Sequence, residues 1–206
     1  MLLDDIKNQV IGIDEVGRGA FCGPVVSCSV LLEKKILNNN LVLQITDSKK
    51  LSHKKRIILS KFIKEYSSYS IGVANNIEID EMNILRATNL SMIRSYDKFK
   101  KTENLIKIDG LKTFSLNEKT TFIKNGDQKS ISIAAASIIA KTWRDRLMTL
   151  YSKIYPMYGW ERNKGYGTHE HRSAIKKFGL TKIHRKSFLR KLICCLLYTS
   201  PSPRDS

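Results

Sequence analysis

The amino-acid sequence predicts an α/β protein in which helices cover a mixed β-sheet. Short apolar runs rich in β-branched residues alternate along the chain with longer segments whose apolar residues recur every three or four positions. This alternation of strands with helices is typical of layered α/β folds. The chain has 206 residues, of which 42% are hydrophobic and 27% charged. That balance suits one globular domain with an ordinary core.

The first two predicted strands lie within residues 9–32. The apolar run 10–13 leads directly into the acidic pair Asp14 and Glu15, and a second apolar run, residues 25–32, follows a glycine-rich turn. Two apolar runs joined by such a turn favour an antiparallel pair. We therefore expect Asp14 and Glu15 at the end of the first strand.

A helix and a third strand are predicted next. Ser52 is a favourable N-cap for a helix that runs to about residue 67, and residues 69–74 have the composition of a strand. The clearest helical segment is 77–101, where six residues at helical spacing define one stripe. They are Met82, Leu85, Asn89, Met92, Tyr96 and Phe99. We interpret this stripe as core packing.

Two short strands and a long helix complete the pattern. Residues 104–108 lead to Asp109, and residues 120–124 lead to Asp127 after a glycine. A helix is predicted over 130–154, and its apolar face recurs every four residues. That face contains Ala135, Ile139, Trp143 and Leu147, broadened by Ala134 and Ile138. Small residues there would let the helix lie close to a sheet.

The net charge is +17, from 36 Lys and Arg against 19 Asp and Glu. So large a surplus indicates a polyanionic partner, and nucleic acid is the first candidate because each neutralised phosphate releases counterions. The alternative is a coding bias towards lysine in an AT-rich genome. No segment resembles a membrane span or a secretory signal, so we expect a cytoplasmic protein without a membrane partner. The four cysteines match no zinc or disulfide pattern and are expected to be free thiols: Cys22, Cys28, Cys194 and Cys195.

Four acidic residues stand out because each closes or follows a predicted strand: Asp14, Glu15, Asp109 and Asp127. Carboxylates at strand ends can converge at one edge of a sheet, and hard oxygen donors suit Mg²⁺ or Mn²⁺. Inside a basic chain such acids would repel phosphate unless cations bridge them. The alternative is four unrelated turn acids, since Asp favours turns. Histidine catalysis is disfavoured because the four histidines are scattered in sequence: His53, His169, His171 and His184.

The residues around these acids resemble the motifs of the type-two ribonuclease H family. Residues 14–19, Asp-Glu-Val-Gly-Arg-Gly, are similar to its signature hexapeptide. Further blocks follow in the family's order and extend to about residue 190: 47–51, 108–110, 134–141, 164–168 and 184–188. The resemblance implies a ribonuclease-H-like fold, with a five-stranded mixed β-sheet flanked by helices and a helical C-terminal part.

The same resemblance implies the activity and its acids. The expected reaction is hydrolysis of the RNA strand of RNA–DNA hybrids, and incision 5′ of ribonucleotides embedded in duplex DNA, giving 5′-phosphate and 3′-hydroxyl ends. Two divalent ions, Mg²⁺ or Mn²⁺, would be held by the catalytic acids Asp14, Glu15, Asp109 and Asp127. Asn125 stands before Gly126 where the family usually has lysine. Asp145 is a rival acid, for which an ion pair with Arg144 and Arg146 is the simpler account.

Substrate contacts are also implied by the resemblance. Gly17, Arg18 and Gly19 suit the sensing of a ribose 2′-hydroxyl, because two glycines let the backbone approach the sugar with free amide and carbonyl groups. Tyr166 resembles a tyrosine that stacks on the deoxyribose at an RNA-to-DNA junction. Gly167 replaces the proline that usually follows it, and is expected to loosen that loop.

Phosphate contacts are expected from Lys49 and Lys50, and from Ser137, for which packing is an equal alternative. Five further basic residues are candidates, each with the alternative of a solvated surface charge: Arg144, Arg146, Lys182, Arg185 and Lys186.

We expect residues 1–191 to form the catalytic domain. Residues 192–206 resemble a translated cloning adapter and are expected to be a non-native or disordered tail. One alternative is a type-three ribonuclease H, disfavoured because the chain starts almost at the first strand. The alternative of another class is a non-catalytic nucleic-acid binder, which gains nothing from acids that face phosphate. A monomer is expected, and a sliding-clamp contact is left open.

Overall fold

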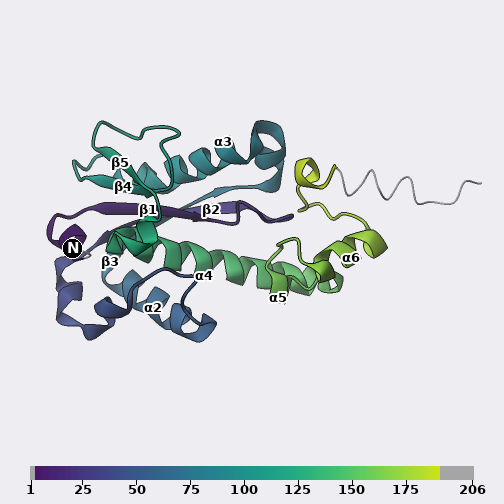
Figure 1. Cartoon of the computed structure of the whole chain (residues 1–206), viewed down its shortest axis with the longest axis horizontal. Helices are drawn as coiled ribbons and strands as arrows, with labels where there is room; N and C mark the ends of the chain where they lie inside the picture. The colour runs from purple at the N-terminus through teal and green to yellow at the C-terminus, as the bar shows by residue number, and fades with distance from the viewer. Residues whose placement is uncertain (1–2, 191–206) are drawn as a thin grey trace, which may run out of the picture.

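A mixed five-stranded sheet forms the centre of the protein, in a computed structural model that describes residues 3–190 (Figure 1). The strands are β1 (Ile11–Val16), β2 (Val25–Leu32), β3 (Ser67–Ala74), β4 (Ile106–Asp109) and β5 (Thr120–Ile123), in the order β3-β2-β1-β4-β5. Strand β2 is antiparallel to both β1 and β3, whereas β4 runs parallel to β1 and β5 parallel to β4. The predicted mixed sheet is confirmed.

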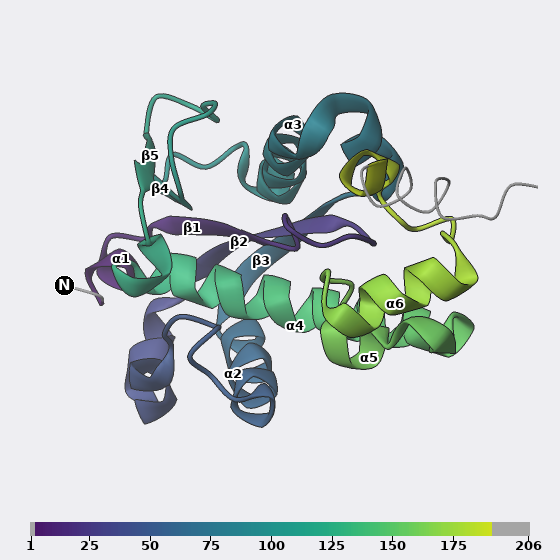
Figure 2. The same ribbon diagram turned by 45° about the vertical axis from the view of Figure 1, so that its right-hand side comes forward.

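Helices cover both faces of this sheet (Figures 1 and 2). The helices are α1 (Asp4–Lys7), α2 (His53–Glu65), α3 (Asn76–Tyr96), α4 (Ile131–Ile154), α5 (Trp160–Asn163) and α6 (His169–Phe178). Short 3-10 turns lie at Lys34–Asn38, Asn40–Gln44, Asp97–Phe99, Gly126–Gln128 and Pro156–Tyr158. Helix α3 lies on one face, and α2 and α4 lie on the other.

The helix starts follow local capping chemistry. The Ser52 hydroxyl accepts a hydrogen bond from Lys55 N at 3.3 Å, and the Ser130 hydroxyl caps α4 in the same way. Asn75 and Glu78 form a reciprocal capping box at α3. The predicted starts at Ser52 and near residue 130 are confirmed, because a cap is a short-range signal.

The predicted stripe on α3 is buried only in part. Met92, Tyr96 and Phe99 pack against β1 and β4 as expected. Leu85, however, is 43% exposed. The backbone at Asn83 leaves the helical region, with φ 72° and ψ 165°, and Met82 before this kink packs in a separate cluster around Val25 and Ile79. Leu85 lies after the kink but lines a surface groove. Core packing is therefore the wrong interpretation for Leu85.

Helix α4 lies very close to β1. A side chain at Gly12 would place its first carbon 2.1 Å from the backbone carbon of Ser132, so only glycine fits there. All residues from 131 to 140 are buried. This confirms that small residues let the helix approach the sheet.

The buried face of α4 differs from the prediction in its second half. Trp143 and Leu147 are only half-buried, whereas Arg144 and Met148 are fully buried. Residues four apart on an α-helix advance by about 40° per step, so a strict every-four series drifts off the contact face. Beyond the sheet, the buried positions of α4 are therefore Arg144 and Met148, each one residue after the predicted Trp143 and Leu147.

The C-terminal part is helical and has its own core. Helices α5 and α6 pack against the far end of α4 around Met148, Trp160 and Ile175. Among residues 3–190, no helix is long and apolar enough to cross a membrane. The predicted tail, residues 192–206, lies outside the described residues.

Candidate active site

Two successive acids close strand β1. Side chains alternate along a strand, so Asp14 faces α4 while Glu15 faces α3. Asp14 is 5% exposed and hydrogen-bonds Ser137 of α4, and its Oδ1 accepts from Glu15 N at 2.7 Å. Glu15 is half-buried and lies 3.5 Å from the Arg18 guanidinium. The strand end therefore presents one carboxylate towards each face.

Asp109 closes the neighbouring parallel strand. Ile13 of β1 pairs with Ile108 of β4, so Asp109 lies beside Asp14 at the same edge of the sheet. Its Oδ1 accepts a hydrogen bond from Gly126 N at 2.6 Å, which ties the next acidic segment to this edge. A side chain at Gly126 would lie 2.5 Å from Ile133 Cδ1, so the end of the Ile133 side chain would have to move to admit one.

The 126–128 turn carries Asp127, which is 6% exposed. Asn125 precedes it in the left-handed conformation, with φ 55°. Asn adopts that conformation more readily than most residues other than glycine. The asparagine that departs from the family pattern is thus compatible with the turn that places Asp127.

Asp47 is a further acid at this edge that the sequence interpretation missed. It is 6% exposed, its Oδ1 accepts from Lys49 N at 2.9 Å, and its carboxyl contacts that of Asp127. The sequence feature that could have identified Asp47 is its position directly before Ser48, Lys49 and Lys50. Carboxylates from four separate segments therefore converge at one edge of the sheet.

This concentration of negative charge raises pKa values. Burial, followed by the charges of Glu15 and Asp109, raises the pKa of Asp14 well above its usual value. Burial also raises the pKa of Glu15, against the opposing charge of Arg18. The pKa of Asp127 is raised by burial and then by Asp47 and Asp109. The acids lack enough positive partners to balance them.

Lys49 lies at the centre of this field. Burial opposes its charged form, but Asp127, Asp14, Asp47 and Asp109 together raise its pKa. Lys49 and the Arg18 guanidinium face five carboxylates, which leaves a net negative charge, and the ligand atoms that the acids offer are carboxylate oxygens. Such a set suits hard divalent cations such as Mg²⁺ or Mn²⁺ and is poor for zinc. The residues present therefore fit a magnesium or manganese centre.

A cavity of about 220 Å³ opens beside the acids. It is lined by Asp14, Glu15, Val16, Ser48, Lys49, Asp109, Ser137, Lys141 and Tyr166. A second groove of about 300 Å³ lies on the α3 side and shares Glu15 and Asp109 with it. Lys50 is exposed and lines neither space. Gly17 and Gly19 also line neither space, and Asp127 joins the acids through Asp47 and Asp109.

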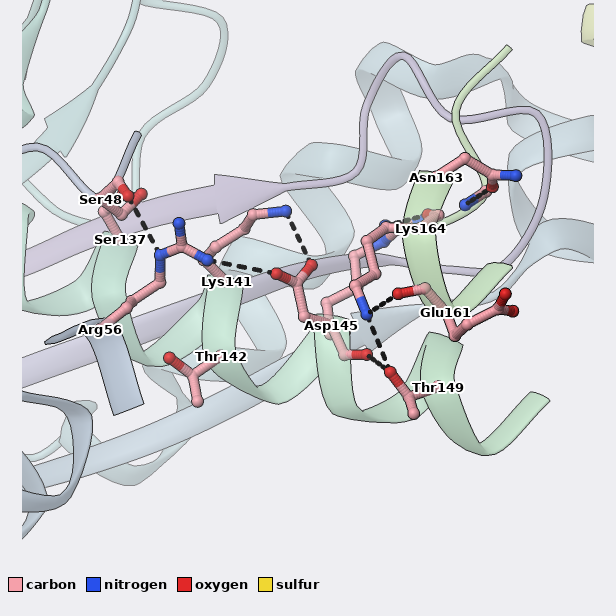
Figure 3. A network of polar contacts seen from close by, with 12 residues as sticks. Ser48, Arg56, Ser137, Lys141, Thr142, Asp145, Thr149, Glu161, Asn163 and Lys164 are labelled. Carbon is pink, nitrogen blue, oxygen red and sulfur yellow. Dashed lines mark hydrogen bonds and ion pairs between the residues drawn. The ribbon is translucent and has the colours of Figure 1, made fainter. Parts of the chain in front are cut away.

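Ser137 joins the cavity to a buried polar network (Figure 3). Its hydroxyl lies 2.7 Å from that of Ser48, and Arg56 Nε donates to Ser48 O at 3.0 Å. Ser137 contacts Asp14 as well, so it both packs and orients an acid.

The expected partners of Asp145 were wrong. It pairs with Arg56 at 3.3 Å and with Lys141 at 2.7 Å (Figure 3). Arg144 instead donates to backbone carbonyls, and within residues 3–190 neither Arg144 nor Arg146 forms an ion pair with Asp145. Neighbours in sequence diverge by about 100° on a helix, while residues four apart meet. Lys141, which the sequence interpretation did not assign, is thereby held at the cavity with its Nζ 5.9 Å from the centre of the Tyr166 ring.

The Tyr166 loop is firmly held, contrary to expectation. The Gly167 carbonyl accepts from Arg172 Nε at 3.0 Å, and Tyr166 O accepts from Thr168 N at 2.8 Å. A side chain at Gly167 would lie 2.3 Å from the Phe21 ring. Gly167 therefore lets an aromatic ring pack against this loop, and it does not loosen it.

Two of the expected surface cations are buried. Arg144 and Arg185 are each 0% exposed, and each donates three hydrogen bonds to backbone carbonyls. Contact of these two residues with phosphate is excluded by that burial. Arg146, Lys182 and Lys186 are exposed, as predicted.

The histidines are less scattered than the sequence indicates. His171 and His184 lie with their Nε2 atoms 3.1 Å apart, and His171 Nδ1 lies 3.0 Å from Tyr166 O, to which it donates. Trp160 Nε1 donates to His171 Nε2, and Thr181 N donates to His184 Nδ1. In the neutral ring His184 Nε2 then carries the proton, and it shares the single lone pair of His171 Nε2 with Trp160.

Cys22 joins these two histidines. The three side chains offer ligand atoms that lie within 4.8 Å of one another, a spacing found in metal sites. Hydrogen bonds, however, already occupy the nitrogens that would bind, and burial raises the pKa of Cys22 to about 12. The trio belongs to the packed C-terminal core.

The buried pair predicts a pH dependence of stability. Burial, and then His171, lowers the pKa of His184 to about 4. In the unfolded chain His184 binds a proton near pH 6.5, whereas in the folded protein it stays neutral down to about pH 4. The contribution of His184 to folding stability is therefore fully present above about pH 7 and is lost as the pH falls towards 4. His184→Gln has no ionisable ring, so unfolding of the variant should take up roughly one proton fewer in this pH range. We therefore expect its unfolding free energy, measured in urea at about pH 7 and about pH 5, to change less with pH than that of the unaltered protein. The other acids act equally in both proteins. An unchanged slope in the variant would contradict the assignment.

Known proteins share this sequence pattern. A model of the ribonuclease HII family matches residues 11–191. Ribonuclease HII of Clostridium beijerinckii is 46% identical over 185 residues, covering 89% of this chain and 68% of that protein. Ribonuclease HII of Staphylococcus epidermidis is 46% identical over 180 residues, covering 87% of this chain and 68% of that protein.

Solved structures share the fold. A ribonuclease HII from Archaeoglobus fulgidus, in a complex with PCNA, superposes with a TM-score of 0.72 at 23% identity, covering 96% of this chain and 100% of that chain. Bst ribonuclease HIII in complex with Mn²⁺ superposes with a TM-score of 0.68 at 20% identity, covering 91% of this chain and 70% of that chain. At such identities the likeness concerns the fold alone.

Proposed function

The chain belongs to the ribonuclease HII family of metal-dependent endoribonucleases, which degrade RNA paired with DNA, and we propose that it also incises duplex DNA on the 5′ side of a single embedded ribonucleotide. The observation that carries this proposal is the convergence of carboxylates from four segments of a chain with net charge +17, beside a cavity that reaches Tyr166. A polyanionic substrate would be attracted by the chain as a whole and cut where the acids gather.

Asp14, Glu15, Asp109 and Asp127 would hold two divalent cations, Mg²⁺ or Mn²⁺, and Asp47 is placed to support Asp127. When bound, such cations lower the pKa of water and neutralise charge on a leaving oxygen, the chemistry needed for 5′-phosphate and 3′-hydroxyl products. The four acids themselves place their carboxylate oxygens together at one edge of the sheet. Ser137 keeps Asp14 oriented, and the Gly126 amide keeps Asp109 oriented.

The basic and aromatic residues of the cavity would bind the substrate. Lys49 and Lys141 line it and would contact phosphates, while Lys50 would act from the exposed surface nearby. Tyr166 would stack against the sugar that follows the ribonucleotide. The 17–19 backbone would sense the 2′-hydroxyl, which is the atom that separates RNA from DNA.

The deciding experiment uses an end-labelled DNA duplex that carries one ribonucleotide, with Mg²⁺ or Mn²⁺. We expect a single incision on the 5′ side of that nucleotide and no cut in the matched all-DNA duplex. A protein that binds this duplex but leaves it uncut would instead be a non-catalytic binder.

Tyr166 provides an internal control for the junction. Tyr166→Ala removes the ring, so we expect it to reduce cleavage at the lone ribonucleotide by roughly tenfold more than cleavage of a long hybrid, where neighbouring contacts compensate. Tyr166→Phe keeps the ring and should retain the ratio. Equal losses of cleavage on both substrates would show that Tyr166 has no specific role at the RNA-to-DNA junction.

A monomer, a cytoplasmic location and a contact with a sliding clamp stay predictions. The clamp partner named for the Archaeoglobus fulgidus structure belongs to that protein, and any contact through residues 192–206 of this chain lies outside the described residues.

A further inference from the structure

The connection between β1 and β2 reaches past the sheet towards α5 and α6 (Figure 2). Its backbone is held from within by Arg185. The guanidinium donates to Gly17 O at 2.7 Å, Arg18 O at 2.8 Å and Gly23 O at 2.9 Å. A single buried side chain from the C-terminal part thus binds both ends of this loop.

Burying the charged Arg185 side chain is energetically unfavourable if its only role is to fill space. Arg185 is 0% exposed, and within residues 3–190 it has no carboxylate at ion-pair distance. A buried cation without a counter-ion is unfavourable unless its donors are satisfied. An apolar residue could fill the same volume at lower cost. What an apolar residue cannot do is fix the direction of two successive carbonyl groups, and the planar fork of an arginine can.

The direction of those carbonyls determines where the amides point. In a trans peptide the C=O and the following N–H point in opposite directions, and no peptide among residues 3–190 is cis. Because Gly17 O and Arg18 O face the buried guanidinium, the N–H groups of Arg18 and Gly19 face outward. The expectation of free carbonyls is therefore wrong for Gly17 and Arg18, whose carbonyls are occupied, whereas the expectation of free amides holds for Arg18 and Gly19.

The two outward amides are available to a ligand. Neither Arg18 N nor Gly19 N has a hydrogen-bond partner within the described part of the chain. Arg18 and Gly19 are exposed, and a side chain at Gly19 would meet nothing within 4 Å, so a sugar can approach the backbone there. Gly17 has φ +92°, and a side chain on it would strike Arg144 at 2.2 Å, so the inward turn requires glycine.

We propose that Arg185 is a positioning residue for the recognition of ribose: by holding the carbonyls of Gly17 and Arg18 inward, it presents the amides of Arg18 and Gly19 as paired donors to the 2′-hydroxyl oxygen. This inference rests on the proposed function. A deoxyribose would leave the two donors without a partner, and a site with unpaired donors rejects the ligand that lacks the matching group.

The test measures how strongly the protein prefers a duplex with one ribonucleotide over the same duplex made only of DNA. Affinities are measured in an Asp109→Asn background, so that binding is separated from cutting. Arg185→Lys keeps the charge but loses the three-way fork, and we expect the preference to fall roughly tenfold. The matched control is Arg144→Lys. Arg144 is equally buried and also donates three backbone hydrogen bonds, to Pro24, Cys22 and Lys164, but none to Gly17 or Arg18.

We expect Arg144→Lys to lose comparable stability and to keep the preference. An Arg185→Lys variant that is folded and keeps the full preference overturns the inference. If Arg185→Lys does not fold, amide hydrogen exchange of the unaltered protein decides. The amides of Arg18 and Gly19 should exchange quickly in the free protein and slowly with the ribonucleotide duplex; slow exchange without ligand, or no change on binding, overturns the inference. Failure of the proposed function is distinguishable, because the unaltered protein would then not cut that duplex.

Discussion

Asp109→Asn is expected to reduce hydrolysis by roughly a thousandfold or more while leaving the protein folded and able to bind a hybrid. The substitution removes one negative charge from the edge where Asp14 and Glu15 also lie. It keeps an amide oxygen that can still accept the hydrogen bond from Gly126 N, now 2.6 Å from Asp109 Oδ1. Turnover and hybrid affinity, measured side by side, check the prediction.

Stability provides a second readout for the same variant. The charge of Asp109 contributes to the raised pKa of Asp14, Glu15 and Asp127, so its removal relieves repulsion in the metal-free protein. We expect the metal-free Asn variant to melt at or above the temperature of the unaltered protein, whereas Asp109→Ala, which also loses the Gly126 bond, should melt lower. Asp97→Asn, an exposed acid paired with Lys100, is the control. Near-normal turnover in Asp109→Asn would contradict a metal-binding role.

Removal of divalent cations is expected to abolish cleavage completely. The acids form a cluster of net negative charge even with Lys49 among them, so binding and catalysis near a phosphate both require added positive charge. Cleavage should vanish in EDTA and return when Mg²⁺ or Mn²⁺ is added in excess. Hydrolysis that persists in EDTA would exclude the proposed mechanism.

The pH dependence of cation binding has a defined sign. The raised pKa values of Asp14, Glu15 and Asp127 mean that protons compete with cations at low pH. The metal-free protein loses stability as the pH rises through those values, because charging the buried acids is unfavourable. We therefore expect the increase in melting temperature caused by Mg²⁺ to grow with pH. Sodium chloride at equal ionic strength is the control, and an equal effect of both salts would indicate screening alone.

Much of the fold was predictable because its signals are local. The caps at Ser52 and Ser130 act over three residues, and the antiparallel pair β1–β2 is encoded by two apolar runs joined by a short turn. The close approach of α4 to β1 followed from its small residues. These features depend on short-range hydrogen bonding and on periodicity, both of which a single sequence contains.

The candidate site was predictable to the extent that acids follow strands. Asp14, Glu15, Asp109 and Asp127 were identified from strand ends and motifs, and the parallel pairing of β1 with β4 explains why the first three meet. Asp47 was missed because it follows no strand. It reaches the cluster only through the loop whose Ser48 carbonyl is held by Arg56.

The sequence by itself determined the order of strands and helices, the helix starts and the residue types from which a cation site can be built. Only the tertiary structure decided that Arg144 and Arg185 are buried, that His171 contacts His184, and that the Gly17 and Arg18 carbonyls face inward. The physical reason is that these outcomes depend on backbone carbonyls and ring nitrogens supplied by distant segments. Every residue carries the same carbonyl, so no sequence pattern reveals which one a buried cation will find.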